Sequence, residues 1–91
     1  MITFEATIVN EVGLHARPAS QFVQRAAKFS SEVQIRKVEA EAKWVNAKSI
    51  LSVLTLGVGK GQQVQIQVSG DDEAEAAESL RQLIESDFEA A

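Results

Sequence analysis

The chain has 91 residues, of which 45% are hydrophobic and 5% aromatic, and it contains one histidine and no cysteine. This size fits one small domain covering residues 1–91, with a mainly aliphatic core. The composition excludes disulfides, thiolate zinc sites, a cysteine nucleophile and a histidine-rich metal cluster, so we expect no metal site. The net charge of −4 argues against nucleic-acid binding and against binding to a membrane surface.

The N-terminal segment predicts a half-buried strand, because apolar and polar side chains alternate over residues 2–8. Residues 10–13 then predict a turn. The segment has neither the basic region nor the apolar region of a signal peptide. No apolar run approaches the roughly 18 residues that a membrane-spanning helix needs. We therefore expect a cytoplasmic protein with no membrane insertion.

A helix is expected from Arg17 to about Phe29, where apolar residues recur on one face. Pro18 lies near its start, where the missing N–H does no harm. His15 immediately precedes this helix, whose free N–H groups carry partial positive charge and can bind phosphate. Arg17 adds guanidinium donors suited to phosphate oxygens, and Gly13 permits a tight backbone path beside the histidine.

His15 is therefore a candidate functional residue. A neutral imidazole is a nucleophile, and a phosphoryl group placed on it would be held by the helix end and by Arg17. No general base, metal site or substrate cleft is evident beside it. The chemistry that this implies is carriage of a phosphoryl group, rather than turnover of a small substrate.

The middle of the chain predicts two short strands and a short helix. One strand begins at Val33, a charged connection covers residues 37–43, and a third strand is expected at 43–45. Residues 49–56 could form a buried strand. We interpret them as a helix, because Ser49 is a good N-cap and Gly57 a good C′ residue.

A fourth strand and a last helix complete the prediction. Apolar residues alternate with glutamines over 64–68, and an apolar stripe runs from Ala77 to Phe88. Asp72 and Glu75 match the spacing of a capping box loosely. Residues 71–91 hold eight acidic residues and one basic residue, which leaves residues 1–70 with five acidic and eight basic.

The glycines at 57, 59 and 61 do not form a nucleotide-binding loop, because Lys60 is followed by Gly61 instead of Ser or Thr. The expected order of elements is βαββαβα. Four strands and three helices predict an α+β, two-layer domain with the helices on one sheet face. The other face should be solvated, which fits its outward polar residues: Thr3, Glu5, Thr7, Gln63, Gln65 and Gln67.

Two motifs resemble a known family. Residues 13–19, Gly-Leu-His-Ala-Arg-Pro-Ala, resemble the active-site motif of HPr, the histidine-containing phosphocarrier of the bacterial phosphotransferase system. Residues 45–57 resemble the regulatory-serine segment of that family. The resemblance covers essentially the whole chain. It implies an open-faced sandwich with a four-stranded antiparallel sheet in the order 1-4-2-3, and a monomer.

The resemblance also implies roles for individual residues. His15 would accept a phosphoryl group from phospho-Enzyme I on Nδ1 and pass it to an enzyme IIA protein. Ala16 and Arg17 would stabilise the phosphate. Ser49 would match the serine modified by HPr kinase/phosphorylase; the alternative is that it serves only as a helix cap. The chain would be a carrier without cofactors, not an enzyme, and its expected docking residues are Ile50, Leu51, Val53 and Leu54.

Three functions stay open at this point: a carrier for sugar transport, a carrier of a nitrogen regulatory branch, and a regulatory module. The module would bind a transcriptional regulator through phospho-Ser49 with His15 idle. Val12 stands where many sugar-branch members carry Ser or Asn. The stretch 36–46 is about three residues longer than in common members, which predicts a longer hairpin away from His15.

Overall fold

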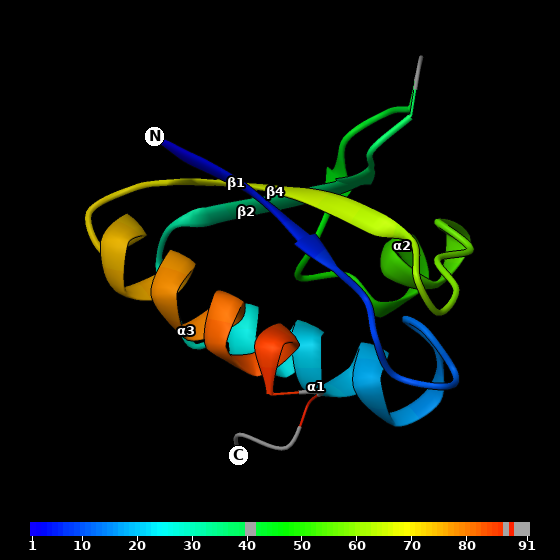
Figure 1. Ribbon diagram of the computed structural model, residues 1–91. Coiled ribbons are helices and arrows are strands. Elements are labelled where there is room, and N and C mark those ends of the chain that lie inside the picture. The colour runs from blue at the N-terminus through cyan, green and yellow to red at the C-terminus, as the bar shows by residue number, and fades with distance from the viewer. Residues whose placement is uncertain (40–41, 87, 89–91) are drawn as a thin grey trace.

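The structure, a computed structural model, describes residues 1–39, 42–86 and 88. Its elements follow the expected βαββαβα order (Figure 1). They are β1 (Ile2–Thr7), α1 (Ala16–Ala27), β2 (Glu32–Lys37), β3 (Val45–Asn46), α2 (Ile50–Thr55), β4 (Gln63–Ser69) and α3 (Glu73–Glu85).

The strands form one antiparallel sheet in the order β1-β4-β2-β3, as expected. The central strand β4 pairs with β1 from Ile2↔Val68 to Thr7↔Gln63, and with β2 on its other side. Helices α1 and α3 lie against one face of the sheet, and α2 lies at one end beside α1 (Figure 1). The fold is therefore an open-faced α+β sandwich.

The core fills the space between the sheet and the helices. Alternate residues of β4 are fully buried, as are Phe22 of α1 and Leu80 of α3. Most outward side chains of the sheet are exposed, as the alternation predicts. Gln65 and Gln67 are half-buried. Arg36 donates to Oε1 of Gln65 at 2.9 Å, and its guanidinium lies 4.5 Å from the centre of the Trp44 ring.

Some element ends differ from the sequence prediction. Helix α1 ends before Phe29, because its last turn tightens and the Phe29 N–H bonds to the carbonyl of Ala26 three residues back. The third strand lies at 45–46, since only these residues pair with β2. The tip of the expected longer hairpin includes residues 40 and 41, which lie outside the described residues.

The expected capping box at the start of α3 is wrong. The Asp72 side chain makes no cap hydrogen bond. Its carboxylate instead accepts from the backbone N–H groups of Ser30 and Ser31, both at 2.9 Å, and from the Ser31 hydroxyl. Three donors from the turn between α1 and β2 outcompete one cap donor. Asp72 therefore joins the ends of two distant elements.

This carboxylate predicts an acid-sensitive part of the stability. The hydrogen bonds from Ser31 and Ser30 lower the pKa of Asp72 from 3.8 to about 2. A lowered folded-state pKa means that the stabilisation is complete above about pH 4 and is lost as pH falls toward 2. Asp72→Asn should therefore be less stable than the wild type at pH 7, with a difference that shrinks toward pH 2.

Urea midpoints measured from pH 7 to pH 2 check this expectation. Subtracting the wild-type midpoint at each pH removes the effect of the carboxylates that both proteins contain. One of these is Glu73, whose pKa is also lowered by its ion pair with the N-terminal amino group. A difference in midpoint that stays constant over the whole range would contradict the role given to Asp72.

Candidate functional site

His15 occupies the N-cap position of α1. Its backbone is extended, with φ −132° and ψ 167°, and its side chain is exposed and makes no cap hydrogen bond. The first turn of α1 contains no acidic residue. The imidazole therefore lies at the positive end of a helix, where an anion on the ring would be stabilised.

The two residues after His15 complete the site. Ala16 has φ +51°, a left-handed conformation that costs an alanine about 1 kcal/mol. Arg17 is exposed and forms no hydrogen bond or ion pair with any described residue. The first N–H groups of a helix have no intrahelical partner. Both the backbone and the Arg17 guanidinium can therefore donate to a phosphate on His15.

The loop before His15 is fixed to the loop between α2 and β4 (Figure 1). The Leu14 N–H donates to the Val58 carbonyl at 3.0 Å, and the Leu14 side chain is buried. Gly13 has φ +67°, and a Cβ atom on it would lie 2.2 Å from the Val58 oxygen. Gly13 is therefore required for two reasons: its positive φ, and the close approach of its backbone to that of Val58.

Ser49 caps α2 as the sequence predicts. Its side chain accepts a hydrogen bond from the Ser52 N–H at 3.4 Å, and the residue is half-buried. Gly57 follows the helix with φ +64°, as a C′ glycine does. The hydroxyl therefore has a structural role in the unmodified protein.

The expected docking patch is smaller than the sequence suggests. Ile50 and Leu51 are exposed, at 38% and 73%. Val53 is fully buried, so it belongs to the core and its expected role in docking is wrong. Leu54 is half-buried and packs against the core. A six-residue helix on the core must turn one face inward, and in α2 that face includes Val53.

Val12 adds apolar surface near His15 and was not among the predicted docking residues. It lies in the loop before His15 and is 52% exposed. Beside it, Glu11 forms an ion pair with Lys60 at 2.9 Å, across to the loop after α2. The sequence could have indicated this surface, because Val12 is an apolar residue within a predicted turn, and turn residues are usually exposed.

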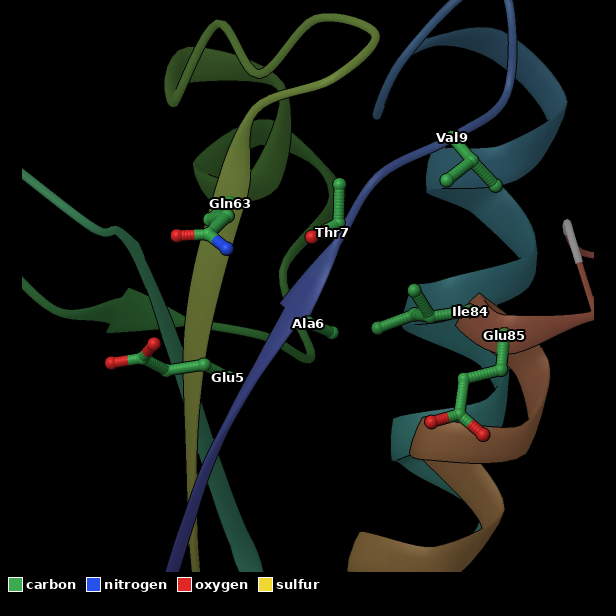
Figure 2. Close-up of a pocket in the computed structure, with 7 residues that line it drawn as sticks. All are labelled: Glu5, Ala6, Thr7, Val9, Gln63, Ile84 and Glu85. Carbon is green, nitrogen blue, oxygen red and sulfur yellow. The ribbon is translucent and has the colours of Figure 1, made fainter.

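A cleft of about 540 Å³ lies away from this site, between the edge strand β1 and the end of α3 (Figure 2). It does not include His15, Arg17 or Ser49. Its lining residues are Glu5, Ala6, Thr7, Val9, Gln63, Ile84 and Glu85. The exposed position of His15 outside this cleft is suited to exchange with another protein, rather than to enclosure of a small substrate.

The described part of the chain contains no group of three His, Cys, Asp or Glu side chains placed to hold a metal ion. Within that part, no helix is both long enough and apolar enough to cross a membrane.

The fold and the site define a class, the small proteins that carry a phosphoryl group on a histidine. A family model described as the PTS HPr component phosphorylation site matches residues 2–86. The chain belongs to this family, HPr, and is a phosphocarrier of the phosphotransferase system.

Solved structures agree with this assignment. HPr-C-His from Thermoanaerobacter tengcongensis is 47% identical, with 100% of this chain and 99% of that chain covered and a TM-score of 0.90. Phosphocarrier protein HPr from Bacillus anthracis is 36% identical, with coverages of 91% and 95% and a TM-score of 0.83. Crh, the catabolite repression containing protein of Bacillus subtilis, is 38% identical, with coverages of 96% and 97% and a TM-score of 0.71; it forms a swapped, intertwined dimer.

Proposed function

We propose that His15 accepts a phosphoryl group from phospho-Enzyme I and passes it to an enzyme IIA protein of sugar transport. The observation that carries the proposal is an exposed histidine side chain without a cap hydrogen bond at the N-terminus of α1, with an exposed arginine two residues on that has no partner among the described residues. The chain would act as a single-domain monomer in the cytoplasm. It would be a carrier, with the donor and acceptor proteins supplying the rest of each active site.

The transfer step balances without a cofactor. The lone pair of His15 Nδ1 attacks the phosphorus on phospho-Enzyme I, and a new N–P bond forms while the donor's bond to phosphorus breaks and the donor keeps that electron pair. Arg17 and the N–H groups at the start of α1 stabilise the charge on the phosphoryl oxygens. In the second transfer, a histidine of the enzyme IIA protein attacks the same phosphorus, the N–P bond to His15 breaks, and Nδ1 of His15 keeps that electron pair.

Docking for this exchange would use a small apolar surface. Ile50 and Leu51 are exposed on α2, which packs against α1, and Val12 is exposed on the loop before His15. Small contacts dissociate quickly, and a carrier that must visit two partners in turn needs fast dissociation.

A relay assay tests this function. Labelled phosphoenolpyruvate and Enzyme I are mixed with a sugar-branch or a nitrogen-branch enzyme IIA protein, with and without this chain. We expect label on the sugar-branch acceptor only when the chain is present. Label on the nitrogen-branch acceptor alone would contradict sugar transport and support the regulatory branch.

We also propose that Ser49 is phosphorylated by an ATP-dependent HPr kinase/phosphorylase. The similarity to Crh, a catabolite repression protein, supports this second role. A phosphate on Ser49 adds roughly −1.5 to −2 charge beside Ile50 and Leu51. Such a charge opposes docking on an acidic surface of Enzyme I and offers a site for a transcriptional regulator.

We expect the kinase and ATP to add one acid-stable phosphate to the wild type and none to Ser49→Ala. The phosphorylated protein should accept phosphoryl groups from Enzyme I about tenfold more slowly, because like charges disfavour docking. Mass spectrometry and transfer rates check both points. Ser52→Ala, in the same helix, is the matched control and should still be modified; loss of the phosphate in both variants would leave Ser49 unsupported as the acceptor.

A further inference from the structure

Asn10 closes the turn that leads to His15. This residue is 7% exposed, and its side-chain Nδ2 donates to the Gly13 carbonyl at 2.6 Å. In return, the Gly13 N–H donates to the Asn10 backbone carbonyl at 3.2 Å. The turn is thus held by one side-chain and one backbone hydrogen bond, both between the same two residues.

This turn determines where His15 lies. Gly13 packs against Val58, and the next residue, Leu14, is bonded to the Val58 carbonyl. His15 follows directly, and after it Ala16 has φ +51°. A left-handed alanine persists only where its surroundings hold it. Without the Asn10 bond, the turn loses its side-chain link, and the backbone at Ala16 gains freedom to relax and carry the imidazole with it.

The other polar atom of the Asn10 side chain shows that stability alone does not explain this residue. Oδ1 is buried and has no hydrogen-bond partner among the described residues. An unpaired buried oxygen is destabilising. Leucine has the same number and branching of side-chain heavy atoms. Leucine at position 10 would remove both the unpaired Oδ1 and the Nδ2 donor. The Gly13 carbonyl would then lose its side-chain donor, so one unpaired acceptor would replace another.

We propose that Asn10 is a positioning residue for phosphoryl transfer, whose amide donor fixes the Gly13 carbonyl and thereby the placement of His15. The inference rests on the proposed function of His15 as the phosphoryl acceptor. Asn10 does not touch the phosphate; it acts through the turn. Its effect should therefore appear in the rate of transfer and in the environment of His15, more than in stability.

The test compares Asn10→Leu with the wild type and with Asp72→Asn. The Asp72 carboxylate binds the turn at the far end of α1, roughly 18 Å along the helix from His15. With this chain as the substrate of Enzyme I, we expect Asn10→Leu to lower kcat about five- to tenfold, with little change in KM. NMR should show shifted His15 and Ala16 signals in Asn10→Leu alone, and Asp72→Asn should transfer at the wild-type rate.

Two results would overturn the inference: wild-type kcat in a folded Asn10→Leu protein, or an equal loss of kcat in Asp72→Asn. Should Asn10→Leu fail to fold, Asn10→Ala takes its place with the same expected loss. The wild-type reaction, run beside the variants, separates the two claims. A wild type that gains no phosphoryl group defeats the proposed function itself, whereas a phosphorylated wild type matched by the variant defeats only the role of Asn10.

Discussion

His15→Ala is expected to gain no phosphoryl group from phosphoenolpyruvate and Enzyme I, while its fold is unchanged. The substitution removes the single imidazole of the chain. The His15 side chain is exposed and makes no cap hydrogen bond, so its loss removes the nucleophile without removing packing. A surface substitution of this kind changes the free energy of unfolding by about 0.5 kcal/mol or less.

Transfer of label and thermal unfolding, measured on the same preparation, check both halves of this expectation. The wild type under the same conditions is the reference for each. Label retained by a folded His15→Ala protein would mean that another residue accepts the phosphoryl group, and would remove His15 from the mechanism. A protein that loses label only because it has unfolded would show a lowered melting temperature.

Arg17→Ala should slow acceptance from Enzyme I by about 10- to 100-fold. Hydrogen bonds to charged groups contribute about 1.5–3 kcal/mol, and each 1.36 kcal/mol in a barrier is tenfold in rate. Because Arg17 has no partner among the described residues, all the N–H donors of its guanidinium are available to the phosphoryl oxygens. Its removal should affect stability little.

Lys28→Ala is the matched control for Arg17→Ala. It removes the same charge from the other end of α1, about 16 Å further along the helix axis. Rapid-quench rates of phosphoryl transfer should fall for Arg17→Ala and stay near the wild type for Lys28→Ala. Equal losses in the two variants would show that only the net charge matters, and an unchanged rate for Arg17→Ala would remove its role.

The sequence predicted the fold well wherever one element carries its own signal. Strand β4 alternates buried apolar residues with glutamines, and α2 has both its cap, Ser49, and its terminating Gly57. Tertiary contacts explain the errors. Asp72 binds Ser30 and Ser31, which lie 42 and 41 positions earlier in the chain. No local capping pattern can indicate such a contact. In α2 four of the six residues are apolar, too many for one inward face, so the pattern did not show that Val53 faces the core.

The candidate residues of the site could be predicted from the sequence, whereas their backbone conformations and long-range contacts could not. His15 and Arg17 were selected because they flank the start of a helix, and the structure places both there. The left-handed Ala16 was not foreseen, because alanine is the strongest helix former and carries no sign of strain. The contact of Asn10 with Gly13 depends on how the loop closes against Val58, which is a long-range feature.

The central claim is that His15 reversibly carries one phosphoryl group. Its most direct test is mass spectrometry of the intact wild-type chain after incubation with phosphoenolpyruvate and Enzyme I, with fragment ions assigned at neutral pH and again after acid treatment. We predict the gain of a single phosphoryl group, located on His15 and lost in acid. No gain with several Enzyme I proteins, or an acid-stable phosphate on another residue, would contradict the account.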